Sequence, residues 1–187
     1  YVATRGLRMG RWEPKEASAE IQVELDNIRL AWQWAATHGG LAELDQATYS
    51  WWQFFQFHGL EAEACQSFAL ALEGVRRQTT LLAANAEADE EYVLFGQRLL
   101  AKLLAIHADT LFAQGRDEEM AAQAREAIRV GRASGGVEGE IFGTFVLGRA
   151  LQELNQHKAA GDLWRQTLQL IQAYQPSHPD SELLRDL

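Results

Sequence analysis

The sequence has very few residues of the kinds that cross-link a chain or interrupt a helix. It contains a single cysteine, Cys65, so no disulfide can form within the chain. One thiol fits a reducing compartment, and we therefore expect a cytoplasmic protein. Because Cys65 lies in "AEACQSFALAL", on an apolar helix face, we expect it to be buried and inert rather than a nucleophile.

Proline is also scarce, with three residues, at positions 14, 176 and 179. Nothing between them forbids a helix, and apolar residues recur three and four positions apart instead of alternating. The pattern predicts an all-α protein of about seven helices. The first three are expected at 16–38, 41–58 and 60–78, two more flank "AQGRDEE" and two flank "ELNQH".

Long apolar runs and clusters of basic residues are missing as well. No run approaches the roughly 18 residues that span a bilayer, and the N-terminal "YVATRGLRMGRW" lacks the apolar core of a signal peptide. The net charge of −9 argues against a surface that neutralises nucleic-acid phosphates. We therefore expect neither a membrane nor a nucleic acid as a partner.

The residues that carry catalysis or bind metals are scattered along the chain. The five histidines, at 38, 58, 107, 157 and 178, form no pair at helical spacing, so no zinc site is predicted. His107 and Asp109 point to different sides of a helix, and we expect His107 in the core. The glycines at 131–148 lack the strand that precedes a phosphate-binding loop. The sequence predicts no enzyme, no cofactor and no metal.

An acidic cluster at residues 87–91 has two interpretations, a cation site and a solvated helix start. We favour the second, because carboxylates are stabilised at the positive end of a helix dipole.

Three segments share one pattern of helix, tight turn and helix. They are "FQFHGLEAEACQSFALAL", "LFAQGRDEEMAAQAREAI" and "LQELNQHKAAGDLWRQTL", with Gly59, Gly115 and Asn155 where a left-handed backbone is needed. Packing positions recur around each turn: Trp51, His107 and Leu147 eight residues before it, Phe55, Leu111 and Leu151 four before, Ala64, Met120 and Ala160 five after, and Phe68, Ala124 and Trp164 nine after.

This pattern resembles the tetratricopeptide repeat, with "VLGRALQELNQHKAAGDLWRQTL" as its best copy. The resemblance implies antiparallel helical hairpins stacked as a short right-handed superhelix. Gly59 and Gly115 are 56 residues apart, whereas Gly115 and Asn155 are 40 apart. We therefore divide a single domain, 1–187, into a leading helix (1–40), repeat 1 (41–78), an insertion (79–95), repeat 2 (96–135), repeat 3 (136–175) and the start of a further helix (176–187).

A narrower resemblance covers the first third of the chain. The run "VELDNIRLAWQWAATHGGLAELDQATYSWWQFFQFHGLEAEACQSFALAL" is similar to the start of the helical-repeat region of bacterial STAND signalling ATPases and large LuxR-type transcriptional regulators. Asp26-Asn27-Ile28-Arg29 and the following aromatic cluster carry the similarity. It implies that this domain is excised from a longer protein whose ATPase precedes residue 1, since the chain holds no G-x-x-x-x-G-K-[ST] loop.

The aromatic run "WWQFFQFHG" at 51–59 raises the choice between a binding surface and a core. A helix that is apolar nearly all round usually lies between two others, so we expect Trp51, Trp52, Phe54 and Phe55 in the core. Trp51 and Phe55 should face the following helix. Phe57 remains open between the two interpretations.

The tetratricopeptide resemblance also implies a concave groove lined by the first helix of each hairpin. Apolar rings mixed with amide and charged groups suit a peptide or protein segment. For Phe142 and Phe145, packing on a neighbouring helix is an equally good interpretation. The implied partner-binding residues are Tyr49, Gln53, Gln56, Phe57, Lys102, Asp109, Phe112, Phe142, Phe145, Arg149 and Gln152.

Our leading hypothesis is therefore a non-catalytic interaction and sensor scaffold of a multidomain bacterial signalling or transcription-regulating ATPase. Its partner would be a protein or peptide segment, or other domains of the parent chain, and uncovered end helices would allow self-association. The alternative is a small-molecule effector pocket in the same solenoid, with residues 79–95 as its lid.

Overall fold

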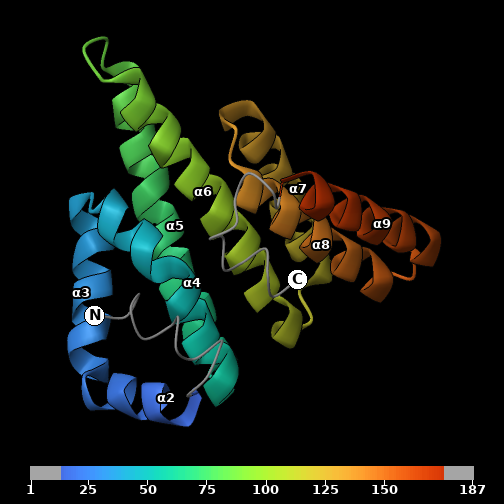
Figure 1. The fold of residues 1–187 in the computed structure, drawn as a ribbon, viewed down its shortest axis with the longest axis horizontal. Coiled ribbons are helices and arrows are strands. Elements are labelled where there is room, and N and C mark those ends of the chain that lie inside the picture. Colours follow the sequence, from blue (N-terminus) through green and yellow to red (C-terminus); the bar gives the residue numbers. More distant parts are fainter. Residues whose placement is uncertain (1–13, 175–187) are drawn as a thin grey trace. The chain divides into compact units, whose positions relative to one another are not determined.

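The computed structural model describes residues 14–174, and the predicted start of a helix at 176–187 lies outside them. The described chain is all-α and contains no strand, as the sequence predicted (Figure 1). Eight α-helices and one 3-10 turn follow in order: α2 (Pro14–Val23), α3 (Leu25–His38), α4 (Leu41–His58), α5 (Glu61–Ala84), α6 (Glu90–Thr110), η1 (Phe112–Gln114), α7 (Asp117–Ser134), α8 (Val137–Glu153) and α9 (His157–Tyr174).

The contacts within the chain divide it into two compact units. Unit 1 is Tyr1–Val75 and unit 2 is Arg76–Leu187, so that α5 contributes to both. Each unit is described by itself.

The prediction of one helix over 16–38 was wrong, because the chain bends at Glu24 between α2 and α3. Glu24 has φ −104° and ψ 11°, and its N–H donates to Ile21 O at 3.1 Å. The bend turns α2 across the end of α4 (Figure 1), where Ser18 Oγ lies 2.6 Å from His58 Nε2. Ile21 becomes fully buried there, while Val23 at the corner stays exposed. No proline or glycine marks this bend in the sequence, so burial of α2 decides it.

The turns between helices follow the predicted geometry. Gly59, Gly115 and Asn155 have φ of 62°, 64° and 60°, which places all three in the left-handed region. The residue after each turn donates its N–H to the carbonyl four residues before the turn: Leu60 to Phe55, Arg116 to Leu111 and Gln156 to Leu151. Gly39 and Gly135, at φ 78° and 71°, make the same turn between other helices.

Unit 1 fills its core with aromatic rings. Trp51, Phe54 and Phe55 are each 1% exposed, which confirms their predicted burial, and Trp52 is half-buried. Trp51 and Phe55 do face the following helix: Trp51 Nε1 donates to Ser67 Oγ at 3.0 Å, and the Phe55 and Phe68 ring centroids are 6.2 Å apart. Cys65 is buried in α5 of the same unit, as predicted.

Unit 2 fills its core mostly with small and aliphatic residues. α6, α7, α8 and α9 pack in sequence, and α6 also packs on α8, so the hairpins α6–α7 and α8–α9 are stacked. A Cβ added at Gly139 would lie 2.5 Å from Ala101 Cβ and 2.6 Å from the Ala101 carbonyl carbon. Glycine is therefore required for α8 to approach α6 so closely. Gly148 similarly leaves room for the indole of Trp164 on α9.

The segment 79–95 is largely helical. α5 continues to Ala84 instead of ending near Gln78, and α6 begins at Glu90. The Asn85 and Asp89 side chains accept hydrogen bonds from Glu87 N and Glu91 N, so they form the turn and cap α6. The extra residues thus lengthen two helices, and the acidic residues after Asp89 occupy the first turn of α6.

Candidate functional site

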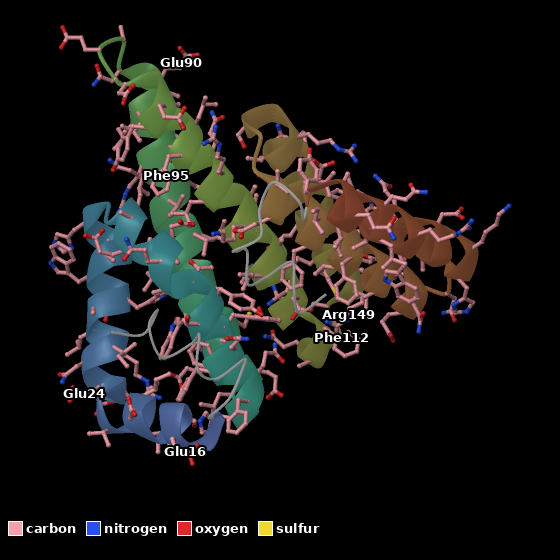
Figure 2. The ribbon with its side chains drawn as sticks, in the orientation of Figure 1. Glu16, Glu24, Glu90, Phe95, Phe112 and Arg149 are labelled. Carbon is pink, nitrogen blue, oxygen red and sulfur yellow. The ribbon has the colours of Figure 1, made fainter. Side chains whose placement is uncertain are left out.

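Two helices of unit 2 bring several predicted partner-binding residues together on one surface. Arg149 of α8 and Phe112 of η1, the turn that follows α6, point toward one another (Figure 2), with the guanidinium carbon 4.2 Å from the ring centroid. Arg149 also forms an ion pair with Asp109, whose side chain is 3% exposed. The arrangement holds a cation over an aromatic face with a buried carboxylate behind it. Phe112 keeps 40% of its surface exposed.

Helical spacing places Phe145 and Gln152 on the same face of α8 as Arg149, and Lys102 on the same face of α6 as Asp109. Lys102 Nζ lies 2.7 Å from Glu138 Oε2, so its charge is paired within the unit. Phe145 is half-buried and stacks on Phe142, with ring centroids 6.2 Å apart. Gln152 is exposed. We call Lys102, Phe112, Phe145, Arg149 and Gln152 the α6–α8 surface.

Two of the unit 2 residues that were expected to line the concave groove lie beneath this surface. Phe142 is 1% exposed and Asp109 is 5% exposed. Neither side chain offers its face to a partner in this structure. They support the surface instead, Phe142 through the ring of Phe145 and Asp109 through the guanidinium of Arg149.

The four predicted partner-binding residues of unit 1 differ in how much of each side chain is exposed. Tyr49 is 9% exposed, and its hydroxyl accepts a hydrogen bond from Gln53 Nε2 at 3.1 Å. Gln53 is half-buried and Gln56 is exposed. Phe57 is 52% exposed, so its side chain does not belong to the core. Exposed Phe57 and Gln56 remain candidates, whereas Tyr49 belongs mainly to the core.

The structure contains a groove that the sequence did not predict, between α3 and α4 of unit 1. Its volume is about 460 Å³ and its lining is mainly apolar. Trp32 and Trp51 line its inner part and are tied to α5, because their indole N–H groups donate to Ser67 O and Ser67 Oγ, each at 3.0 Å. The α3–α4 groove is lined by Glu24, Asn27, Ile28, Ala31, Trp32, Ala35, Glu43, Leu44, Gln46, Ala47 and Trp51.

The signal for this groove was present in the sequence but ambiguous. Ala31, Ala35 and Ala47 are small residues that line the space between α3 and α4. Ile28, Trp32 and Ala35 recur at helical spacing and are buried, but the sequence does not show how much of the space that they face is filled by α5.

The charge of this part of the chain is strongly one-sided. Residues 14–75 contain nine Asp or Glu and two Lys or Arg. One of the two, Arg29, donates to Glu63 at 2.6 and 2.8 Å and to Asp26 at 3.0 Å. The hydrogen bond to Glu63 raises the pKa of the Arg29 guanidinium, as an ion pair that favours the charged form does. Arg29 thus joins α3 to α5, and the two carboxylates that line the groove are Glu24 and Glu43.

The described residues contain no group of three or more His, Cys, Asp or Glu placed to hold a metal ion. His107 is 6% exposed, and its Nδ1 lies 2.6 Å from Gln123 Oε1. Burial lowers the pKa of His107 below that of an exposed histidine. His107 therefore occupies the packing position that the repeat alignment predicted.

Among the helices of residues 14–174, none combines the length and the apolar character that crossing a membrane requires.

No family model matches the chain, and no curated protein or solved structure matches it either.

Proposed function

We propose that this chain is a non-catalytic helical-repeat scaffold that binds a protein or peptide segment through the α6–α8 surface. The observation that carries the proposal is the pairing of Arg149 with Phe112 beside Phe145 and Gln152. Aromatic rings and arginine supply much of the energy at protein interfaces, because they combine apolar area with directional hydrogen bonding. Hairpins stacked through α6 and α8 give such residues a rigid support.

The parent protein is best placed among bacterial STAND signalling ATPases and large LuxR-type transcriptional regulators. The resemblance of Asp26-Asn27-Ile28-Arg29 supports this placement. The motif has a plain structural role: Asn27 Nδ2 donates to Glu24 Oε2 at 2.7 Å, and Arg29 joins Asp26 to Glu63. In such a regulator, partner binding by this scaffold would change its contact with the ATPase. The single buried cysteine fits a cytoplasmic location.

The experiment is an affinity capture of cytoplasmic proteins on the immobilised chain, compared with the double variant Phe112→Ala/Phe145→Ala. A control variant, Leu168→Ala, removes a comparably exposed apolar side chain from α9, away from this surface. We expect a protein that wild type and Leu168→Ala retain and the double variant loses. Equal retention by all three chains would contradict the proposal. Tyr49 is not substituted, because its truncation would disturb a core residue.

A small-molecule effector site is the second candidate function, and the α3–α4 groove is the observation that favours it. Its volume of about 460 Å³ lies within the range of ligand pockets. Residues 79–95 belong to α5, a turn and α6, and the groove lining contains none of them. A metabolite that co-purifies with wild type and is lost on substitution of a groove residue would support this function over the scaffold.

A further inference from the structure

The α3–α4 groove has a shape that differs from an enclosed ligand cavity. It is partly open to solvent, and its lining extends from Glu24, the residue before α3, to Ala35. Eleven residues of helix span roughly 16 Å, the length of three helical turns. Because Ala31, Ala35 and Ala47 have short side chains, space remains between α3 and α4 for the side chains of a third helix.

Apolar surface continues beside the groove on α3. Leu30 and Trp34 are 64% and 57% exposed, and each directly precedes a groove-lining alanine. On a helix this places them about 100° around the axis from Ala31 and Ala35. A small molecule seated in the groove would leave these side chains in water. Exposed apolar patches of this kind mark protein interaction sites, which favours a macromolecular occupant.

Carboxylates lie at both ends of the groove. Glu24 is at the start of α3, close to the corner with α2 (Figure 2), and Glu43 is in the first turn of α4, next to the Gly39–Gly40 turn. Residues 14–75, the described part of unit 1, carry nine acidic and two basic side chains. Carboxylates attract cations and repel anions, so the occupant should carry positive charge near Glu24 and Glu43, on both sides of an apolar face.

We propose that the α3–α4 groove binds a basic amphipathic helix of a protein partner. The apolar face of that helix packs on Trp32, Ala31 and Ala47, and its Lys or Arg residues meet Glu24 and Glu43. Helices with this design commonly occupy apolar grooves on their partners. The site is distinct from the α6–α8 surface, which belongs to the other unit, and does not depend on the function proposed for it.

The test uses the whole 187-residue chain and a fluorescein-labelled synthetic helix of about five turns, with Leu on one face and Lys on the other. Fluorescence anisotropy measures its affinity. A control peptide has Glu in place of every Lys. We expect the Lys peptide to bind at least about tenfold more tightly than the Glu peptide, with an affinity that falls as salt is added. Equal affinity for the two peptides would overturn the proposal.

Matched variants locate the binding. Ala31→Trp places a large ring in the groove at an exposed position, and Ala69→Trp adds the same ring to an exposed position of α5 outside it. We expect the first to weaken binding of the Lys peptide about tenfold or more and the second to leave it unchanged. Circular dichroism checks that both variants keep the helical content of the wild type. Equal effects of the two tryptophans would contradict a groove site.

A second pair of variants separates the rim carboxylates from net charge. Glu24→Gln/Glu43→Gln and Glu61→Gln/Glu73→Gln remove the same charge, but only the first pair lines the groove. We expect about fivefold weaker binding for the first and little change for the second. Equal weakening would show unspecific attraction and overturn the proposal. So would calorimetric binding of a small hydrophobic ammonium, such as phenethylammonium, by a chain that does not bind the Lys peptide.

The Phe112→Ala/Phe145→Ala variant should bind the Lys peptide like wild type. Peptide binding by this variant tests the proposal for the α3–α4 groove, and its affinity capture tests the proposal for the α6–α8 surface, so either proposal can fail independently of the other.

Discussion

Residues 25–75 and residues 90–174 use the same left-handed turns, but they fill the space between their helices differently. Unit 1 places Trp32, Trp51 and Phe68 between helices, with Trp32 and Phe68 ring centroids 5.4 Å apart. Unit 2 brings α6 and α8 together at Gly139 and Ala101. On the same face of α3, Trp32 packs against Trp51 and Phe68, and the small residues Ala31 and Ala35 beside it leave a groove toward α4.

The comparison shows that one turn geometry accommodates either kind of packing. The hydrogen bond that closes each turn is local, between residues five apart, so it does not depend on what lies between the helices. The distance between the helices is determined by side-chain volume. Side chains of very different size face one another in unit 1, so α3 and α4 pack less closely than adjacent helices of unit 2 and a groove forms between them.

The largest effect should come from truncating a ring of unit 1. Trp51→Ala removes a side chain that is 1% exposed and its hydrogen bond to Ser67, and we expect the free energy of unfolding to fall by about 3–5 kcal/mol. Trp34→Ala is the matched control, because Trp34 is 57% exposed, and it should cost less than about 1 kcal/mol. Urea denaturation followed by circular dichroism measures both. Equal losses would mean that Trp51 is not a core residue.

An intermediate effect should come from adding volume to unit 2. Gly139→Ala introduces a Cβ 2.5 Å from Ala101 Cβ and close to α6 backbone, so α6 and α8 must separate, at a cost of about 1–3 kcal/mol. Gly161→Ala on α9 meets no atom within 4 Å and should stabilise the helix by about 0.5–1 kcal/mol. The two alanines should therefore change the urea midpoint in opposite directions. A shift of the same sign would refute the close approach of α8 to α6.

The smallest effect concerns His107, which is buried in the core of unit 2. Burial lowers the pKa of His107 below the value of about 6.5 that it has when unfolded. The unfolded chain then binds the proton more readily, so stability is lost as the pH falls below about 6.5 and is unaffected above it. Glu119, Arg116 and Arg76 are the charged groups that act on this ring.

We therefore expect the melting temperature of the wild type to decrease when the pH is lowered from about 7.5 to about 5.5. The decrease should be smaller for the His107→Gln variant. His38→Gln, at an exposed position, serves as the control and should follow the wild type. Thermal unfolding by circular dichroism at the two pH values provides the measurement. An unchanged pH dependence in His107→Gln would show that protonation of His107 does not contribute.

Much of the helical arrangement could be predicted because its determinants are local. The turns at Gly59, Gly115 and Asn155 follow from residue type and position, and the spacing of Leu147, Leu151 and Ala160 identified buried positions. The bend at Glu24 could not be predicted in this way. It has no local cause in residue type, and results from burial of Ile21 against the rest of unit 1.

The candidate surfaces were predicted less well than the fold. A register carried over from a repeat family identifies which side of a helix faces a groove, but not how much of each side chain the neighbouring helices cover. Phe112 and Arg149 are accessible, whereas Phe142 and Asp109 at neighbouring positions are buried. Burial depends on the helix that packs alongside, and that helix lies about 40 residues away in sequence, as the Asp109–Arg149 pair illustrates.

The sequence by itself determined that this protein is helical, where its left-handed turns lie, and that residues 14–75 are acidic, because propensity, turn chemistry and charge are properties of residues and their near neighbours. Only the tertiary structure decided that the alanines of α3 and α4 border an open groove and that Arg149 lies over Phe112. These features depend on the separation of helices, which is settled by the volumes of side chains far apart in the chain.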